Sequence, residues 1–359
     1  MTLRHLSLAQ FRSWPRLELE LDDRPLAIFG PNGAGKTNIL EAVSMLAPGR
    51  GLRGASPRDQ ARRGPDAGWR IRARIGDQVV ETAALPGETR SVTIDGKAAA
   101  QLALGELIRL IWLTPSMDRL WTDAPEARRR FLDRVTLSFA PGHAEAALAY
   151  ERAMRDRNRL LRDEIRDDRW YRALESRMAE AGAAMTVNRL HAIARIHAAQ
   201  AGAATSFPAA RLTLLPGEGS ADDADPTSIA ARLADTRPRD MAAGRTLTGP
   251  HRADLGAHWG TQDMPAALSS TGEQKALLLS LILANARSLD AERPILLMDE
   301  AAAHLDAGRR AALYDEIAAL PGQALLTGTG RELFDSFGDR ARFLEITRSG
   351  EVSQLHEAG

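Results

Sequence analysis

The sequence predicts an α/β fold, a mixed sheet with helices, that is split into two halves by a mostly helical inserted arm. Three observations lead to this prediction. A strand, a glycine-rich turn and a helix follow one another between residues 25 and 46. Residues 143–203 contain almost no glycine or proline, which favours long helices. From residue 272 onward, helix and strand patterns alternate again.

We therefore expect residues 1–115 to form the N-terminal half of the α/β lobe, 116–245 the arm, and 246–359 the C-terminal half. In the first half, "LRHLSLAQF" and "RLELELD" alternate between apolar and polar residues, and "PLAIFG" is a short apolar run. These patterns predict three strands. "TNILEAVSML" has helical spacing. Residues 69–95 predict an antiparallel β-section with Gly and Asp turns.

The arm begins with a helical pattern in "TDAPEARRRFLDRV", which carries Pro and Glu in its first turn. Two long helices follow, with a break expected near "RDDRW". "SFPAARLTLLP" and "ADLGAHWG" predict strands, and "DADPTSIAARLADTR" predicts a capped helix between them. The last part predicts alternating helices and strands, ending in a short strand pair; their expected bounds are helix 272–289, strand 294–298, helix 306–319 and strand 323–327.

Composition is that of an ordinary globular protein, with 44% apolar and 26% charged residues. No apolar run approaches the ~20 residues that span a bilayer, and the N-terminus does not resemble a secretion signal. The chain has no cysteine, which excludes disulfides and thiolate metal sites. We expect a cytoplasmic protein without a membrane partner. A net charge of zero argues against nucleic-acid binding, but the charges are unevenly distributed.

The glycine-rich turn "GPNGAGKT" fits the phosphate-binding pattern G-x-x-x-x-G-K-[ST]. Its glycines let successive backbone N–H groups point at phosphate oxygens. Lys36 is expected to contact the β- and γ-phosphates, and the Thr37 hydroxyl to bind Mg²⁺. The full set of expected ATP contacts in this loop is Gly30, Pro31, Asn32, Gly33, Ala34, Gly35, Lys36 and Thr37.

The segment "PILLMDE" predicts a buried strand that ends in two acids. Asp299 at the strand end is expected to hold Mg²⁺, and Glu300 to orient or deprotonate the attacking water. Lys36 and Glu300 are thus the expected catalytic residues. Asp306, six residues later, has the position of a helix N-cap, which is compatible with a further role at the nucleotide.

The segment "LSSTGEQ", residues 268–274, allows two interpretations. It is an ordinary helix start, with Ser270 or Thr271 as the cap and Glu273 in the first turn. Alternatively it is a second phosphate grip, because free N–H groups at a helix start bind anions.

The order of these motifs resembles that of the ABC-type ATPases. In that superfamily, the Ser–Gly signature binds the γ-phosphate of the nucleotide held by the other subunit. The resemblance implies that Ser270 and Gly272 act in trans on ATP held at Lys36 of a second copy, with Asp306 as the D-loop residue. No histidine follows strand 323–327, where Thr327 and Thr329 stand instead. Neither the switch residue nor the lid glutamine of the superfamily is assignable, and slow turnover is expected.

Five segments resemble parts of the RecF family of bacterial recombination-repair proteins. "LRHLSLAQFRSW" resembles its opening strand and turn, and "GPNGAGKTNILEAVSMLAPGRGLR" resembles its phosphate-binding loop, helix and following basic turn. Its internal signatures are resembled by "TPSMDRLWTDAPEARRRFLD", "YERAMRDRNRLLRD" and "LTGPHRADL". This resemblance implies a weak, Mg-dependent and DNA-stimulated ATPase that forms an ATP-dependent homodimer on ssDNA and dsDNA. It also implies a role in recombinational repair and replication restart, where the protein helps RecA loading at ssDNA gaps together with RecO and RecR. Two alternatives remain: an ABC ATPase subunit of a transporter, and a non-hydrolysing scaffold.

Residues 50–74 contain eight arginines, which can contact DNA phosphates or form a solvated basic face. The candidate DNA contacts are Arg50, Arg53, Arg58, Arg62 and Arg63. A second arginine group, Arg128, Arg129, Arg130 and Arg134, can contact DNA or pair with acids inside the arm. His251 and Arg252 can approach nucleotide or DNA, or serve only in packing. No base-reading module is found, so recognition of DNA backbone and structure is expected.

Overall fold

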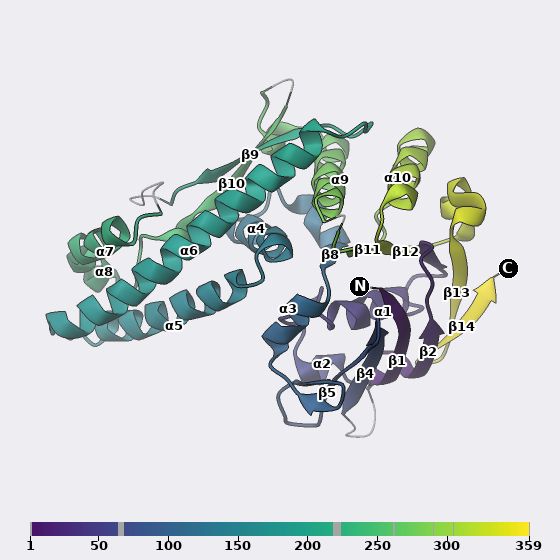
Figure 1. Cartoon of the computed structure of the whole chain (residues 1–359), viewed down its shortest axis with the longest axis horizontal. Helices are drawn as coiled ribbons and strands as arrows, with labels where there is room; N and C mark the ends of the chain where they lie inside the picture. Colours follow the sequence, from purple (N-terminus) through teal and green to yellow (C-terminus); the bar gives the residue numbers. More distant parts are fainter. Residues whose placement is uncertain are drawn as a thin grey trace. The chain divides into compact units, whose positions relative to one another are not determined.

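The computed structural model describes residues 2–63, 68–217, 224–260, 263–289, 291–303 and 305–358 (Figure 1). The chain forms two compact units. The α/β unit comprises Met1–Asp118, Ala203–Pro208 and Thr271–Gly359, and the helical unit comprises Arg119–Gly202 and Ala209–Ser270. The predicted fold class, a mixed sheet with helices interrupted by a mostly helical insertion, is confirmed.

The α/β unit contains, within the described residues, a six-stranded sheet in the order β14-β13-β3-β12-β11-β8. All neighbours are parallel except β14, which pairs antiparallel with β13 at one edge. The strands are β3 (Leu26–Phe29), β8 (Leu110–Leu113), β11 (Ile295–Met298), β12 (Gln323–Gly328), β13 (Arg342–Ser349) and β14 (Val352–Ala358). The central strands are buried along their whole length, and β3 and β11 are entirely apolar, as is typical of parallel strands covered on both faces.

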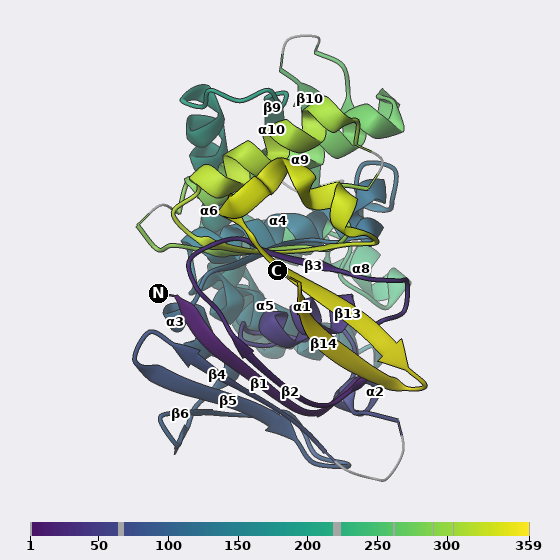
Figure 2. The ribbon, with the colours of Figure 1, turned by 90° about the vertical axis from the view of Figure 1, so that its right-hand side faces the viewer.

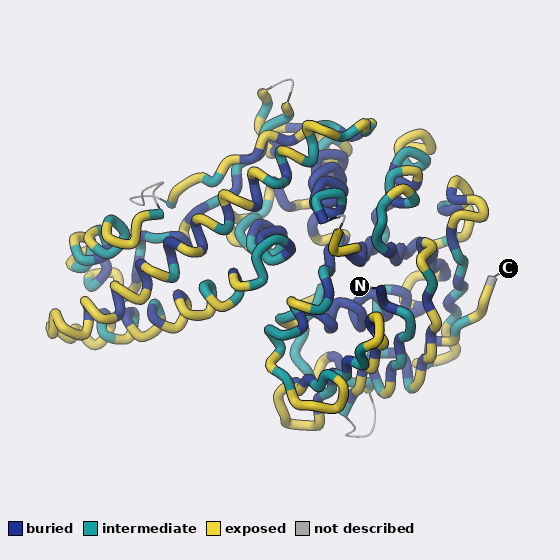
Figure 3. The backbone as a smooth tube through the Cα atoms, in the orientation of Figure 1, coloured by how far each residue is buried: buried dark blue, intermediate teal, exposed yellow. Residues whose placement is uncertain are grey.

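Helices cover this sheet on both faces. Figures 1 and 2 show α9 (Thr271–Arg287) and α10 (Ala307–Ala319) on one face, and α1 (Lys36–Ser44) with a second sheet on the other. Figure 3 shows α9 buried over most of its length, and every residue from Gln274 to Ala286 is buried. The predicted helices and strands of this C-terminal part are confirmed to within two residues at each end.

The second sheet is antiparallel and has the order β2-β1-β4-β5-β6-β7 among the residues described. Its strands are β1 (Leu3–Phe11), β2 (Trp14–Glu20), β4 (Trp69–Ile75), β5 (Gln78–Ala84), β6 (Ser91–Ile94) and β7 (Lys97–Ala98). Strand β4 alternates strictly, with Ile71 buried and Arg70 and Arg72 exposed. The buried face of this sheet shares one hydrophobic core with α1 and the parallel sheet.

The helical unit contains the two long helices that the sequence predicts, α5 (His143–Arg162) and α6 (Asp168–Ala201). The break between them contains Glu164 in the left-handed region, with φ 50°, and Asp167, whose side chain caps α6. Its other elements are α4 (Pro125–Phe139), β9 (Ala210–Leu215), α7 (Pro226–Asp235), α8 (Arg237–Ala243) and β10 (Asp254–Trp259). Short elements elsewhere or at unit limits are α2 (Pro57–Gln60), α3 (Leu104–Leu107), η1 (Gln101–Ala103), η2 (Pro115–Arg119), η3 (Pro250–Arg252), η4 (Ala266–Leu268) and η5 (Arg331–Arg340).

The limits of the two units differ from the expected segments. The first boundary lies after Asp118 rather than residue 115, and the second after Ser270 rather than residue 245. The second difference has a clear cause, because β10 pairs antiparallel with β9 and so belongs to the helical unit. No helix in the described ranges is long and apolar enough to cross a membrane.

A buried ionic cluster holds the helical unit together. The Arg157 guanidinium is fully buried and donates to Glu175 (3.1 Å), Asp240 (2.7 Å) and the Thr246 hydroxyl (2.9 Å). Its fourth bond, 2.8 Å long, goes to the Leu233 carbonyl oxygen. Because the two acids are buried as well, their charges depend on this one guanidinium and on Arg237, which also pairs with Glu175. The cluster thereby joins α5, α6 and α8.

Candidate functional site

The turn at residues 30–37 needs glycine for steric reasons. Gly30, Gly33 and Gly35 have φ of 147°, 79° and 107°, a region that L-residues rarely adopt. A Cβ on Gly30 would lie 2.0 Å from the Ile346 carbonyl oxygen, and one on Gly35 2.2 Å from Ser353 Oγ. The loop backbone therefore packs against Ile346 and Ser353 at a distance that only glycine permits. The chain then enters α1 directly, so that the loop N–H groups adjoin the N-terminus of this helix.

Two hairpins from opposite ends of the chain support this loop. Ser353 Oγ, in β14, lies 2.5 Å from the Ala34 carbonyl oxygen and 2.6 Å from Ser13 Oγ. Trp14 donates from its indole N–H to the Gly35 carbonyl oxygen at 3.3 Å. These supporting residues were not predicted, because nothing in the local sequence indicates a contact between residues 340 positions apart.

Lys36 begins α1, and its side chain is buried beneath the loop. Its Nζ donates to the carbonyl oxygens of Gly30 (2.7 Å) and Pro31 (3.0 Å). Burial lowers the pKa of Lys36, and the nearby carboxylates of Glu300 and Asp299 act in the opposite direction. The ammonium group is thus held by weak neutral acceptors, which a bound phosphate can replace.

The acids at the end of β11 meet the loop directly. The Thr37 hydroxyl donates to Asp299 Oδ1 at 2.8 Å, and the Thr327 hydroxyl donates to the same oxygen at 2.7 Å. Parallel strands β3, β12 and β11 lie side by side, so the residues that follow them meet at one edge of the sheet. A hydroxyl and a carboxylate side by side are hard oxygen donors, which fit Mg²⁺ when it also takes phosphate oxygens.

Glu300 lies at a sharp turn directly after this strand. Its φ is 49°, in the left-handed region that a non-glycine residue seldom occupies. Its backbone N–H donates to Thr327 Oγ1 at 3.0 Å, which fixes the turn. Glu300 is half-buried, and its carboxylate is close enough to Lys36 to act on the pKa of that lysine.

The "LSSTGEQ" segment lies at the exposed end of an otherwise buried helix. Ser270 immediately precedes α9, and Ser270, Thr271 and Gly272 are all exposed. A Cβ placed on Gly272 would meet no atom within 4 Å. The N-terminus of α9 is therefore open to solvent and accessible to a ligand or a second molecule.

Asp306 is the N-cap of α10, as the sequence predicts. Its Oδ1 accepts from the backbone N–H of Arg309 at 2.8 Å. A capping role accounts for this aspartate within one chain; a contact with a nucleotide in a second copy stays a prediction.

The five candidate DNA arginines do not form one surface of equivalent residues. Arg53 donates to Glu41 Oε2 (3.1 Å) and to Asn38 Oδ1 (3.0 Å), so it belongs to a network on α1. Glu41 is fully buried there and also pairs with Arg12. Arg62 is half-buried, with its Nε buried. Arg50, Arg58 and Arg63 are exposed, and so is Arg53, whose side chain is 41% accessible although it pairs with Glu41.

The other arginines of residues 50–74 lie on the exposed face of β4. Arg70 pairs with Glu81 at 3.3 Å and Arg74 with Glu20 at 3.7 Å. This face is therefore a solvated surface of mixed charge, which offers less attraction to a phosphate backbone than the unpaired sequence pattern indicates.

In the second arginine group, residues 128–134, Arg128 and Arg129 contact other parts of the helical unit, which favours a structural role over a role in DNA contact. Arg128 forms two bonds of 2.8 Å with the Asp254 carboxylate, and Arg129 donates to the Ala253 carbonyl oxygen at 2.9 Å. Both contacts lie within the helical unit, between α4 and the start of β10. These guanidinium groups therefore position a loop rather than present free charge.

His251 also has a packing role. Its Nε2 lies 3.3 Å from the Thr246 carbonyl oxygen, and its Nδ1 lies 2.8 Å from the Tyr150 hydroxyl. A carbonyl accepts only, so Nε2 carries the proton and Nδ1 accepts from Tyr150. Burial lowers the pKa of His251 to about 4. Two of the segments that resemble family signatures, one containing Tyr150 and one containing His251, are thus in direct contact.

The burial of His251 beside Tyr150 predicts that the free energy of unfolding depends on pH. The pKa of His251 is about 4 when folded and 6.5 when exposed, so the unfolded chain binds the extra proton between these values. The free energy of unfolding should therefore fall by roughly 3 kcal/mol as the pH drops from 7 to 4. In urea denaturation, His251→Gln should lack this part of the pH dependence. Equal pH slopes in the two proteins would contradict the assignment.

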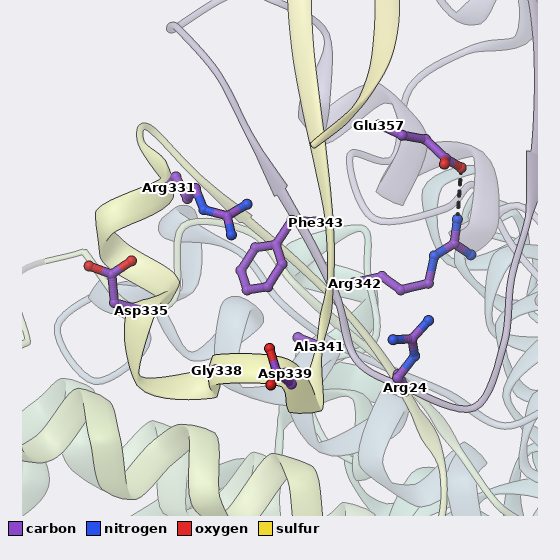
Figure 4. Close-up of a pocket in the computed structure, with 9 residues that line it drawn as sticks. All are labelled: Arg24, Arg331, Asp335, Gly338, Asp339, Ala341, Arg342, Phe343 and Glu357. Carbon is purple, nitrogen blue, oxygen red and sulfur yellow. Dashed lines mark hydrogen bonds and ion pairs between the residues drawn. The ribbon is translucent and has the colours of Figure 1, made fainter. Parts of the chain in front are cut away.

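A hollow of about 520 Å³ lies at the amino ends of strands β3 and β13, away from the glycine-rich loop that follows β3 (Figure 4). It is formed around the start of β13, where Arg342 pairs in register with Leu26, the first residue of β3. Its three arginines all have partners: Arg342 pairs with Glu357 at 3.2 Å, Arg24 pairs with Asp22 at 2.8 Å, and the Arg331 guanidinium lies 4.2 Å from the centre of the Phe343 ring. The lining is Arg24, Arg331, Asp335, Gly338, Asp339, Ala341, Arg342, Phe343 and Glu357.

Comparison with known proteins agrees with this geometry. The family described as "AAA domain" matches residues 5–81, which include the glycine-rich loop. The DNA replication and repair protein RecF of Mesorhizobium japonicum is 45% identical over 372 residues, which cover 98% of each chain. RecF of Brucella suis is 44% identical over 384 residues, covering 99% of this chain and 97% of that protein.

Two solved structures show the fold. One is described as the recombination mediator protein RecF-ATPrS in the RecFOR pathway, with a TM-score of 0.82, 19% identity and coverage of 98% and 97% of the two chains. The other is the Smc head domain of Pyrococcus furiosus, with a TM-score of 0.57 and 17% identity, covering 100% of this chain and 96% of that one. The fold is thus that of an ABC-type ATPase head, as the motif order predicts. Near-full-length identity to curated relatives shows that the chain belongs to the RecF family of DNA replication and repair proteins.

Proposed function

We propose that this protein is an ATP-gated DNA-binding protein of recombinational repair and replication restart. ATP binding joins two copies head to tail on DNA, and slow hydrolysis releases them. The observation that carries the proposal is the meeting of Thr37, from the glycine-rich loop, with Asp299, from the end of β11, 262 positions away. Lys36 and Glu300 lie at the same edge of the sheet.

Each residue of this site has a distinct task in the proposal. The loop from Gly30 to Gly35 surrounds the phosphates with backbone N–H groups. Lys36 exchanges its carbonyl partners for the β- and γ-phosphates. Thr37 and Asp299 would hold Mg²⁺, which neutralises the charge that develops on the transferred phosphoryl group. Glu300 holds the attacking water and accepts its proton.

The exposed start of α9 supports the second part of the proposal. Ser270 and Gly272 bind the γ-phosphate of ATP held by the second copy, and Asp306 approaches the same nucleotide. Two reciprocal contacts of this kind form a closed, two-fold interface, in which each ATP is buried between both chains. Hydrolysis removes the γ-phosphate and with it the link between the copies.

Loss of ATP binding is the direct test. Lys36→Met removes the ammonium group and should reduce ATP affinity at least about 10-fold, since a charge-assisted contact of about 1.5–3 kcal/mol is lost. ATP-dependent retention of the protein on duplex DNA should disappear with it. Fluorescent-nucleotide titration and DNA anisotropy measure both. Unchanged DNA affinity in the variant with ATP present would refute the proposed gating.

DNA contact is proposed for the exposed arginines Arg50, Arg58 and Arg63, with smaller contributions from Arg53 and Arg62. Each arginine that neutralises a phosphate steepens the salt dependence of binding by about 0.9 in the slope of log K against log salt. Replacing Arg50, Arg58 and Arg63 with glutamine should therefore flatten the slope by up to about 3. Arg70→Gln/Arg72→Gln/Arg74→Gln, on the outer face of β4, is the matched control. An equal loss in both triple variants would exclude a local DNA contact.

The partners follow from the family. Interaction with RecO and RecR, and help in loading RecA at ssDNA gaps in the cytoplasm, are part of the proposal. A transporter ATPase subunit is the main alternative, and it should bind a membrane partner but not DNA. A non-hydrolysing scaffold is the second alternative, and it should be indifferent to the replacement of Glu300.

A further inference from the structure

Thr327 occupies the centre of the candidate site, although no motif indicates it. It lies near the end of β12, and its side chain is 1% exposed. The strand before it, "QALL", is buried throughout. A hydroxyl at the end of such a strand needs partners, because a buried unbonded polar group is costly.

The sheet order places Thr327 between the two halves of the site. Strand β12 lies between β3 and β11, with Thr327 in register with Ile28 and Leu326 in register with Met298. Thr327 is therefore level with the residue that follows Met298, which is Asp299. On its other side, β3 leads into the glycine-rich loop.

The Thr327 hydroxyl uses both of its bonding functions on the acids. It donates its proton to Asp299 Oδ1 at 2.7 Å and accepts the Glu300 backbone N–H at 3.0 Å. A hydroxyl has one proton, and here that proton is already committed to Asp299. Thr327 is thus suited to positioning these two acids rather than to contacting the nucleotide.

The two hydrogen bonds of Thr327 fix the Asp299 carboxylate and the Glu300 backbone, whose positions decide where metal and water can bind. Within the described part of the chain, the side-chain bonds to the Asp299 carboxylate from Thr37 and Thr327 both end on Oδ1, which leaves Oδ2 directed away from them. The bond to Glu300 holds a backbone at φ 49°, and so determines where the Glu300 side chain begins. One hydroxyl therefore links the orientation of Asp299 to the turn that carries Glu300.

We propose that Thr327 is a positioning residue that aligns Asp299 and Glu300 with each other, and so controls turnover and metal dependence rather than nucleotide binding as such. This inference rests on the proposed function of the site. If the Thr37 hydroxyl turned to a bound metal, the hydrogen bond from Thr327 would still hold the Asp299 carboxylate. The second bond of the same hydroxyl, from the Glu300 backbone N–H, would keep Glu300 in place beside it.

The test compares Thr327→Val, which has the same shape but no hydroxyl, with Thr327→Ser, which keeps the hydroxyl. Thr329→Val, an exposed neighbour, is the matched control. Loss of a supporting bond around a metal ligand commonly costs about 10–100-fold in metal affinity or activity. We expect Thr327→Val to lower kcat about 10–100-fold and to raise the Mg²⁺ concentration needed for tight ATP binding about 10-fold. ATP affinity measured without Mg²⁺ should stay unchanged.

Thr327→Ser should restore both quantities to within about 3-fold of the wild type, since it keeps a hydrogen bond of this strength. If Thr327→Val does not fold, Thr327→Ala removes the hydroxyl without adding bulk. Wild-type turnover and Mg²⁺ dependence in the valine or alanine variant would overturn the inference, as would a serine variant equally impaired. A wild-type protein that binds no MgATP would instead overturn the proposed function, and this inference with it.

Discussion

Replacing Glu300 with glutamine is expected to lower ATP turnover about 10²–10⁴-fold, the usual contribution of a positioned general base. Glutamine has the shape of glutamate, but its amide cannot take a proton from the attacking water. The turn itself should survive, because its bond to Thr327 is made by the backbone N–H of residue 300. ATP binding should therefore remain, and single-turnover kinetics with a nucleotide-binding assay separates the two.

Asp299→Asn is the informative companion to this variant. The Asp299 carboxylate accepts from Thr37 and Thr327, and we assign it to the metal rather than to the water. Its replacement should weaken Mg²⁺-dependent ATP binding, whereas Glu300→Gln should not. If Glu300→Gln retained turnover within about 3-fold of the wild type, the proton acceptor would have to be another group.

Replacing Arg157 with methionine is expected to lower the free energy of unfolding of the helical unit by about 3–5 kcal/mol. Glu175 and Asp240 are buried, and without the guanidinium Asp240 loses its 2.7 Å ion pair. Methionine fills much of the space but supplies no charge. Urea denaturation followed by the helical circular dichroism signal measures the loss.

Arg159→Met provides the control for this prediction on the same helix. Arg159 is 70% exposed and lies 4.0 Å from Asp156, so its removal should change stability by no more than about 0.5 kcal/mol. A similar loss in both variants would mean that helix propensity, rather than the buried cluster, accounts for the effect. A loss below about 1 kcal/mol in Arg157→Met would show that the acids find other partners.

Local patterns were sufficient for much of this fold. The glycine-rich loop is recognisable because its three glycines satisfy a steric demand within eight residues. The long helices follow from the scarcity of Gly and Pro. The capped start of α7 and the Asp306 cap of α10 follow from side-chain hydrogen bonds within the first helical turn. In each case the interaction that decides the structure lies within a few residues along the chain.

Contacts between distant segments were not predictable in this way. The second limit of the arm was placed too early, because β10 pairs with β9 across some forty residues of sequence, a pairing that no local pattern encodes. The arginines of residues 50–74 looked like one cluster, but burial and pairing divide them among Glu41, the β4 face and the solvent. The sequence drew attention to Thr327 only because no histidine follows strand 323–327. Its role was not predictable, because its partner Asp299 follows another strand.

The central claim is that the "LSSTGEQ" segment binds the nucleotide held by a second copy of the chain. The molar mass of the protein in solution tests this claim most directly. Glu300→Gln should be measured by light scattering without nucleotide, with MgATP, and with MgATP and duplex DNA, beside the double variant Glu300→Gln/Ser270→Arg. We predict that the 38.9 kDa chain doubles in mass with MgATP, and that the added Ser270→Arg change abolishes the doubling. A chain that stays monomeric throughout, or a double variant that still pairs, would contradict the claim and leave this segment as the cap of α9.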